Sequence, residues 1–405
     1  MVKVAILGYG TVGSGVFEVL NTNSASIAKR VGEEVQVKYV LDLREFPGDP
    51  VEPVLVHDYE VIVNDPEVDI VVETMGGVNP AYPFSKRALE AGKSVCTSNK
   101  ELVARHGTEL MKIAKEKSIN YMFEASCGGG IPIIRPINSS LTADEIDEIT
   151  GILNGTTNYI LSKMSSDGSD FADVLKEAQE KGYAEKNPEA DVEGYDPCRK
   201  IAILSSLAYE QFVDYQDIYT EGITKITATD IKYAKEMGAA VKLLATSRKT
   251  EQGIYAMVSP VMIASTHPLY SVNDVFNAIF VHGNMLGDAM FYGSGAGKLP
   301  TASAVAGDVV DIAKNLHHTV MMGWKEEKLE LLPISQVTSR FFVRVQGVVA
   351  DVLPAVEAAF GKVETISLPG VEGEFAFVTE TMTEEAYKAA AEKVDGIISM
   401  IRARF

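Results

Sequence analysis

A glycine-rich turn that directly follows an apolar segment, close to the start of the chain, most constrains the fold. Residues 4–13 read VAILGYGTVG, which predicts a strand, a tight turn and then a helix. Gly8 permits the turn, Gly10 lets the backbone approach a pyrophosphate, and Gly13 lets the helix pack closely against the strand. The N–H groups at the start of the helix would bind the phosphates. Since the motif opens a strand–helix–strand unit, it favours dinucleotide binding over a plain turn.

Two residues after the second predicted strand bear on the choice of nucleotide. Asp42 ends that strand and suits the 2′-hydroxyl of NAD, whereas Arg44 suits the 2′-phosphate of NADP. Arg44 is equally compatible with a solvated surface charge. The sequence therefore leaves NAD(H) and NADP(H) both open.

A chain of 405 residues is longer than one hydrophobic core usually supports, so we expect several domains. Short β-branched runs alternate with helical stretches over residues 1–138, which predicts an α/β domain with a Rossmann-type doubly wound parallel sheet. A helical stretch at about 301–320 is expected to return to this domain. The predicted strands are Lys3–Leu7, Val35–Leu41, Asp69–Glu73, Ser94–Thr97 and Asn120–Glu124.

The rest of the chain follows other patterns. Residues 139–300 mix strands and helices, which indicates an α+β domain for substrate binding and dimerisation. The charge cluster and proline in 321–335 are typical of a linker. Residues 336–405 fit strand, helix, strand, strand, helix, strand, which is the ferredoxin-like βαββαβ arrangement.

The overall charge limits the partners that we expect. The formal net charge is −19, which disfavours nucleic acid and anionic membrane surfaces because both require a basic face. No apolar run reaches the ~20 residues that a membrane-spanning helix needs. Cys96, Cys127 and Cys198 lack metal-ligand spacing, and their odd number fits reduced thiols in the cytoplasm.

Two loops follow strands at the edge of the sheet where ligands bind in this architecture. Lys100 closes the segment after the fourth strand and suits a phosphate, a carboxylate or a developing alkoxide, although an exposed loop lysine is the alternative. Glu124 begins the next loop, which contains the consecutive glycines Gly128–Gly130. Their carbonyls and the carboxylate could wrap a cation, or the loop could be a flexible connection between domains.

The most chemically loaded stretch runs from Lys181 to Lys200 and holds five carboxylates in a loop followed by a helix. Asp196 and Pro197 are predicted as the helix cap and the first helical residue. Lys200 would then lie one turn further, on the side of Asp196. There it is suited to general acid–base catalysis of an alcohol or carbonyl, but a plain solvated i,i+4 pair fits the same spacing.

Taken together, these residues resemble the homoserine dehydrogenase family over about the first 320 residues. The matching motifs are Gly8–Gly13, Ser98–Lys100, Glu124–Pro132, Asn154–Ile160, Gly182–Lys200, and Gly293–Gly297 with Pro300 and Thr301. The resemblance implies hydride transfer between NAD(H) or NADP(H) and the C4 carbon of L-homoserine or L-aspartate 4-semialdehyde. The reaction belongs to threonine, methionine and isoleucine biosynthesis.

The resemblance also implies a role for individual residues. Lys200 would be the proton donor, Lys100 would assist, and Glu185, Asp191 and Asp196 would hold the amino acid. The residues implied to contact the nucleotide are Gly8, Gly10, Thr11, Val12, Gly13, Asp42, Arg44, Ser98, Lys100, Gly182 and Gly297. The family also carries a monovalent cation, usually Na+, which implies a site built from Glu124 and the carbonyls of Cys127, Gly129 and Ile131.

The last 70 residues resemble an ACT module, a small amino-acid-binding regulatory fold. The usual Asp-x-Pro-Gly-Val-like turn is replaced by GVVADVL at residues 347–353, so threonine as an effector is a hypothesis from fold analogy, with a role in assembly as the alternative. The family implies a homodimer or homotetramer that uses the central sheet. The rival interpretations are another amino-acid dehydrogenase, such as one for aspartate, and a non-catalytic amino-acid sensor, which Lys100 and Lys200 disfavour.

Overall fold

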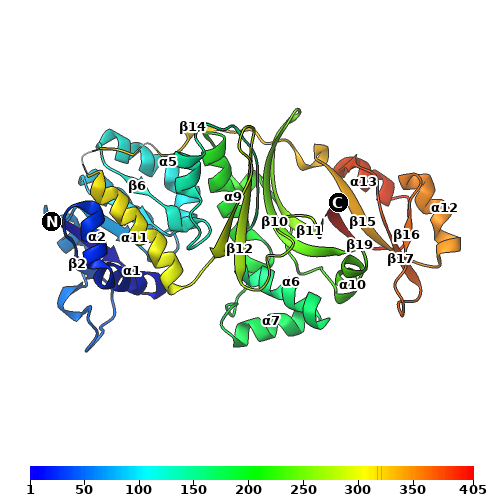
Figure 1. Cartoon of the computed structure of the whole chain (residues 1–405), viewed down its shortest axis with the longest axis horizontal. Coiled ribbons are helices and arrows are strands. Elements are labelled where there is room, and N and C mark those ends of the chain that lie inside the picture. The colour runs from blue at the N-terminus through cyan, green and yellow to red at the C-terminus, as the bar shows by residue number, and fades with distance from the viewer. Residues whose placement is uncertain (317, 321) are drawn as a thin grey trace.

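The computed structural model describes residues 1–316, 318–320 and 322–405, and it arranges them in three regions along one axis (Figure 1). The first region is built on a parallel sheet of six strands in the order β3-β2-β1-β4-β5-β6. The strands are β1 (Val2–Leu7), β2 (Val35–Leu41), β3 (Leu55–Val56), β4 (Ile70–Glu73), β5 (Ser94–Thr97) and β6 (Tyr121–Met122). This confirms the doubly wound sheet, whose strand order reverses between β1 and β4.

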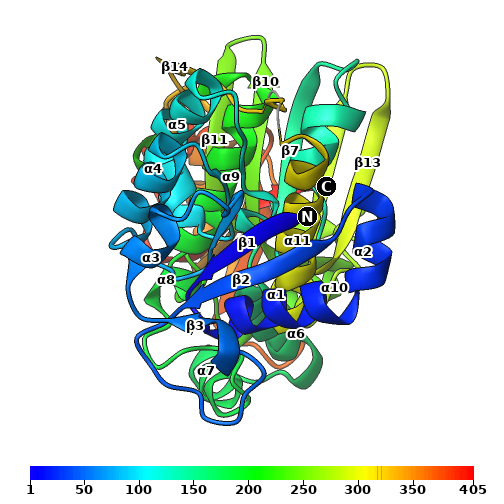
Figure 2. The same ribbon diagram turned by 90° about the vertical axis from the view of Figure 1, so that its left-hand side faces the viewer.

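Helices cover both faces of this sheet. The helices on one face are α1 (Thr11–Thr22), α2 (Ser24–Val31) and α11 (Lys298–Lys314), and those on the other are α4 (Ala81–Glu90) and α5 (Lys100–Glu116) (Figure 2). The short α3 (Tyr59–Val63) lies beside α4. Gly15 allows α1 and α11 to meet, because a Cβ there would lie 2.8 Å from the carbonyl oxygen of Lys298. The late helix therefore returns to the first region, as predicted.

The second sheet has eleven strands and extends through the other two regions in the order β13-β12-β7-β10-β11-β19-β15-β17-β16, with β9 and β18 at its margins. Its central strands are β7 (Ile146–Ile152), β9 (Tyr219–Thr220), β10 (Ala239–Thr250), β11 (Gly253–Ala264), β12 (Phe276–Gly283) and β13 (Gly287–Ser294). The helices of this region are α6 (Gly155–Asp167), α7 (Phe171–Glu180), α8 (Glu189–Val192), α9 (Tyr195–Ala208) and α10 (Ala228–Glu236). Helices α6 and α9 pack against β10.

The C-terminal region has the predicted order of elements. Its elements are β15 (Thr338–Gln346), α12 (Val349–Phe360), β16 (Thr365–Ile366), β17 (Glu374–Val378), β18 (Met382–Thr383), α13 (Glu384–Ala391) and β19 (Ile397–Arg404). The strand order β19-β15-β17-β16 is that of the split βαβ fold. Thr383 caps α13, as predicted, by accepting a hydrogen bond from the N–H of Ala386. Because β19 pairs in parallel with β11, the strands of this region continue the central sheet and do not form a separate one.

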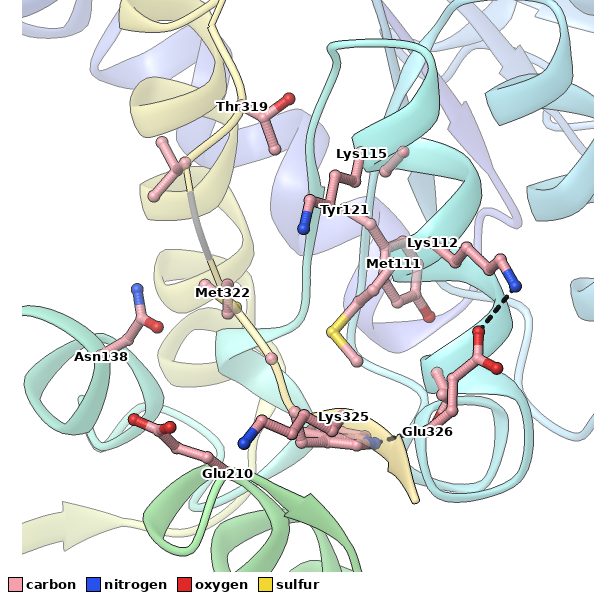
Figure 3. A pocket seen from close by; sticks show the side chains of 15 residues that line it. Met111, Lys112, Lys115, Tyr121, Asn138, Glu210, Thr319, Met322, Lys325 and Glu326 are labelled. Atoms are coloured by element: carbon pink, nitrogen blue, oxygen red, sulfur yellow. Dashed lines mark hydrogen bonds and ion pairs between the residues drawn. The ribbon is translucent and has the colours of Figure 1, made fainter.

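The segment expected to be a linker is partly anchored to the protein. Residues Lys325–Lys328 form β14, which pairs with β8 (Gln211–Phe212), and the indole of Trp324 donates a hydrogen bond to Thr108. Figure 3 shows how this segment borders a cavity of about 510 Å³ beside α5, where Lys112 pairs with Glu326 at 2.8 Å. The charged residues of this segment therefore form ion pairs with other parts of the protein, and the segment is not a flexible linker throughout. No helix in the described part of the chain has the length and hydropathy to cross a membrane.

Candidate active site

A cavity of about 500 Å³ lies between the first region and the central region. The start of α1, the loop after β5, the start of α6 and the first turn of α9 all contribute to its lining. The predicted site residues that line it are Val12, Ser98, Lys100, Gly129, Gly182, Asp191, Asp196, Lys200 and Gly297. Residues from both of the first two regions therefore meet around one space, at the carboxyl ends of β1 and β5 where ligands bind in this fold.

The glycine loop has the geometry that a pyrophosphate requires. A Cβ at Gly13 would lie 1.8 Å from the carbonyl oxygen of Gly8, so only glycine allows α1 to approach the strand this closely. A Cβ at Gly10 would meet nothing within 4 Å, which leaves open space in front of the helix. Gly10 is also the N-cap of α1 and provides no side-chain cap, so the first N–H groups are left for an anion. The loop therefore fits a dinucleotide.

Asp42 and Arg44, which favour different nucleotides in the sequence analysis, form an ion pair. Arg44 donates from Nε to Asp42 Oδ1 and from Nη2 to Asp42 Oδ2, both at 2.9 Å, and Asp42 also accepts the N–H of Tyr9 at 2.8 Å. Burial alone would raise the pKa of this carboxyl group, but hydrogen bonds from Arg44 hold the pKa of Asp42 well below its usual range. The guanidinium lies over the ring of Phe46, beside the glycine loop. Arg44 is thus tethered beside the glycine loop while remaining exposed.

Lys200 is held in the cavity wall by two oxygen atoms. Its Nζ donates to Asp196 Oδ2 at 2.8 Å and to the carbonyl oxygen of Leu153 at 2.7 Å, and only 10 % of the side chain is exposed. The predicted i,i+4 relation between Asp196 and Lys200 is confirmed. An ammonium group has three N–H donors, so within the described part of the chain one donor of Lys200 remains for a ligand.

Lys100 approaches the same carboxylate from the first region. Its Nζ lies 2.7 Å from Asp196 Oδ1, so Asp196 stands between two ammonium groups. Burial would raise the pKa of Asp196, but the charges of Lys200 and Lys100 overcome this and hold its pKa well below the usual range. The same attraction raises the pKa of Lys100. Asp196 is therefore a carboxylate held between two lysines that line the cavity.

Asn154 connects the two carboxylates, and its role was not predicted. Its Nδ2 donates to Asp191 Oδ1 at 2.7 Å and to Asp196 Oδ2 at 2.8 Å, while its Oδ1 caps α6 by accepting the N–H of Thr157. Burial raises the pKa of Asp191, and this hydrogen bond acts against that rise. The signal was present in the sequence, because Asn154 begins one of the motifs by which the chain resembles the family.

Helix α9 begins earlier than the sequence suggests, and Asp196 is not its cap. The N-cap is Gly194 and the helix starts at Tyr195, so both Asp196 and Pro197 lie inside the first turn. Gly194 has φ +83° and its Cβ would lie 3.1 Å from Cγ2 of Thr220, which favours glycine. The prediction was wrong because the Asp196 side chain turns inward to the two lysines rather than toward the backbone of its own helix.

The glycine-rich loop after β6 is tightly packed, which disfavours a flexible connection. A Cβ at Gly129 would lie 2.4 Å from the carbonyl oxygen of Gly295, and the N–H of Gly130 donates to the carbonyl of Ser294. The buried carboxylate of Glu124 accepts the N–H groups of residues 133, 134 and 135 at 2.6–3.0 Å. The loop thus joins the first region to the strand β13.

The same loop has oxygen atoms of the kind that bind cations. Within the described part of the chain, the carbonyl groups of Cys127, Gly129 and Ile131 accept no hydrogen bond, and Glu124 supplies a buried carboxylate. No group of three or more His, Cys, Asp or Glu side chains in the described residues is arranged to hold a metal ion. Oxygen atoms of this kind suit a hard cation and not a transition metal.

Among the three residues predicted to hold the amino acid, Glu185 is the one that does not line the cavity. It lies exposed on the loop after α7, is absent from the lining of the cavity, and its carbonyl oxygen accepts a hydrogen bond from Gln179. Its neighbours Gly182 and Tyr183 do line the cavity. The role of Glu185 in substrate binding stays a prediction.

A nucleotide-binding loop that shares one cavity with a lysine–carboxylate cluster defines the class of dinucleotide-dependent oxidoreductases. Models of the homoserine dehydrogenase family and of its NAD-binding domain match residues 132–310 and 8–124. The chain belongs to the homoserine dehydrogenase family and is an oxidoreductase with an NAD-binding domain.

Individual relatives agree with this assignment. Homoserine dehydrogenase of Neisseria gonorrhoeae is 37 % identical over 99 % of this chain and 98 % of its own. That of Corynebacterium glutamicum is 45 % identical over 78 % of this chain and 73 % of its own. The crystal structure of a homoserine dehydrogenase from Thiobacillus denitrificans covers 100 % of this chain and 98 % of its own, with a TM-score of 0.90 and 35 % identity.

Proposed function

We propose that the enzyme interconverts L-homoserine and L-aspartate 4-semialdehyde with NAD(H) or NADP(H), in the biosynthesis of threonine, methionine and isoleucine. The observation that carries this proposal is the cluster of Lys200, Asp196 and Lys100 in the same cavity as the nucleotide loop. Family membership supports the substrate pair.

Lys200 moves the proton in the proposed reaction. Its third N–H donates to the C4 carbonyl oxygen of the semialdehyde, and in the reverse direction the amine takes the proton of the homoserine hydroxyl. Asp196 and the carbonyl of Leu153 hold Nζ in place, and Asp196 keeps the lysine from being repelled by Lys100. The nicotinamide, when bound, supplies or takes the hydride at C4.

Carboxylates bind the amino group of the substrate. Asp191 lines the cavity and is oriented by Asn154, while Glu185 lies on an exposed loop two residues after the cavity-lining Tyr183. An ammonium group between such carboxylates forms charge-assisted hydrogen bonds. We propose that the loop carrying Glu185 contributes to this contact once substrate is bound.

The nucleotide preference rests on Arg44. We propose that its exposed guanidinium contacts the 2′-phosphate of NADP(H), with NAD(H), favoured by Asp42, as the alternative. A hyperthermophilic archaeal homoserine dehydrogenase whose structure was solved in complex with NADPH matches 77 % of this chain with a TM-score of 0.66 and 29 % identity. We also propose that Na+ binds Glu124 and the carbonyls of Cys127, Gly129 and Ile131, where it would fix the loop that borders the cavity.

The C-terminal region is proposed to be an ACT-like regulatory domain that responds to threonine, or else a domain that serves assembly. Its βαββαβ order supports this proposal. A homodimer or homotetramer formed through the central sheet is part of the same proposal.

Initial rates test the proposed function. Oxidation is measured with L-homoserine or L-aspartate, with NAD or NADP, with and without threonine, and in Na+ or a bulky organic cation. We expect turnover with homoserine only and a higher kcat/KM with NADP. Turnover with aspartate alone supports the aspartate dehydrogenase alternative, and binding of amino acid without turnover supports the sensor. Threonine that changes neither rate nor thermal stability assigns the C-terminal region to assembly.

A further inference from the structure

Arg402 on β19 connects the C-terminal region to the central region through a buried guanidinium group. It donates from Nε and Nη2 to the two carboxylate oxygens of Glu384, at 2.6 and 3.1 Å, and from Nη1 to Oε2 of Glu221 at 2.7 Å. Only 2 % of its side chain is exposed, and it lies over the ring of Tyr219. One cation therefore joins α13, β19 and the segment that contains Glu221.

Glu221 begins a segment that packs against residues 192–194, the turn between α8 and α9. We call this turn the catalytic corner. A Cβ at Gly222 would lie 2.2 Å from the carbonyl oxygen of Val192, and the N–H of Ile223 donates to that same carbonyl at 2.8 Å. Val192 directly follows Asp191, which binds substrate in our proposal. The backbone at Gly222 lies so close to Val192 that a methyl group at Gly222 would clash with it. A displacement of Glu221 is therefore expected to displace this corner.

A second arginine of β19 reaches the opposite side of the site. Arg404 donates from Nη1 to Oε1 of Glu148 on β7 at 2.8 Å. The end of β7 leads to Leu153 and Asn154, which hold Lys200 and both carboxylates. The last strand of the chain thus contacts both β7 and the segment that packs behind the start of α9.

We propose that Arg402 and Glu221 are positioning residues for the amino-acid site: through Gly222 and Val192 they hold Asp191 and the start of α9 at the geometry that catalysis requires. This inference rests on the proposed function of Asp191, Asp196 and Lys200. The C-terminal region is thereby a structural part of the active site. A displacement of about 1 Å at reacting groups can cost about a hundredfold in rate, so a support outside the cavity has a measurable effect.

A matched ion pair separates positioning from ordinary stabilisation. Arg344 on β15 also joins two carboxylates, Asp230 on α10 at 2.9 Å and Glu374 on β17 at 2.8 Å. Glu374 and Glu221 each provide the second carboxylate of a buried arginine, but Glu374 lies within the C-terminal region. Truncating either residue leaves its arginine with one carboxylate partner, and only Glu221 belongs to the segment behind the catalytic corner.

The test compares Glu221→Ala, Glu221→Gln and Glu374→Ala in the full-length enzyme. For Glu221→Ala we expect the KM for homoserine to rise about tenfold and kcat to fall, with the KM for the nucleotide unchanged. Glu221→Gln keeps an acceptor for Arg402 and should restore most of the loss. Glu374→Ala should lower thermal stability and leave the kinetics of the folded enzyme unchanged.

Hydrogen exchange of the free enzyme provides a readout that does not depend on turnover. Exchange over residues 189–200 should increase in Glu221→Ala and not in Glu374→Ala. Equal kinetics and equal exchange in the two alanine variants would overturn the positioning role, as would an equal rise in the KM for the nucleotide. If wild-type enzyme fails to turn over homoserine while the exchange difference persists, the proposed function fails and the structural coupling stands.

Discussion

Two buried clusters of charge, one around Lys200 and one around Arg402, have similar ingredients and different surroundings. In each, a cation with a tenth or less of its side chain exposed lies 2.6–2.8 Å from a carboxylate oxygen. Arg402 donates to two carboxylates through three of its nitrogen atoms, whereas Lys200 retains one N–H beside a cavity. The difference indicates that a cation shared between two carboxylates holds elements together, while a cation that keeps an N–H donor for the substrate cavity is suited to chemistry.

Removing the open donor gives the largest expected effect. Lys200→Met should lower kcat by about 10²–10⁴-fold, because the semialdehyde oxygen loses its proton donor. The affinity for the nucleotide should stay close to wild type, since Lys200 is separated from the glycine loop. Steady-state rates and a fluorescence titration of the reduced nucleotide measure the two effects.

Lys112→Met is the control, because that lysine lines the other cavity and pairs with Glu326 on the surface. It should leave kcat unchanged. A Lys200→Met enzyme that keeps its turnover would remove the distinction between the two clusters, since the open donor would then have no chemical use.

Breaking the Arg402 cluster should affect stability first. Arg402→Met leaves Glu384, which is almost completely buried, without its cation. Loss of one partner of a buried ion pair costs about 3–5 kcal/mol, which should lower the urea midpoint of the C-terminal region. Arg340→Met is the control, because Arg340 is less buried and donates from Nε to the carbonyl oxygen of Thr379. Equal midpoints for the two variants would contradict a structural role for the Arg402 cluster.

The sequence predicted the position of a site residue correctly where the residues that fix its geometry are close to it along the chain. Gly8 and Gly13 are related by one strand–helix turn, and Asp196 and Lys200 by one turn of helix, so their geometry follows from local rules. The strand-end position of Lys100 followed from the alternation of strands and helices. In each case the spacing alone limits where the side chain can go.

The remaining contacts depend on pairings that no local pattern specifies. Arg402 and Glu221 are 181 residues apart, and the parallel pairing of β19 with β11 that brings them together involves two regions expected to be separate. The start of α9 was misplaced for a related reason, because two lysines from outside its first turn compete for the side chain of Asp196. Tertiary partners override capping preference in such a place.

Lys242 on β10 is a further buried cation and gives the smallest predicted effect. Its Nζ donates to the carbonyl oxygen of Val272 at 2.5 Å and to Oδ1 of Asn273 at 2.9 Å, so its acceptors are neutral, unlike those of Lys200 and Arg402. Burial lowers the pKa of Lys242 to about 8. Lys242 thus differs from Lys200 and Arg402, because its ammonium group is desolvated by burial and no carboxylate contacts it directly to offset that cost.

The direction of the pH dependence follows from proton binding. Between pH 8 and the unfolded pKa of about 10.4, the unfolded chain binds more protons at this site than the folded chain. The free energy of unfolding of wild type should therefore rise with pH relative to Lys242→Met, by roughly 1 kcal/mol between pH 7 and pH 9. Urea unfolding at several pH values measures this, with Lys235→Met on the exposed side of α10 as the control with a constant difference. A constant difference for Lys242→Met as well would mean that the neutral oxygens stabilise the ammonium as effectively as the carboxylates stabilise Lys200 and Arg402.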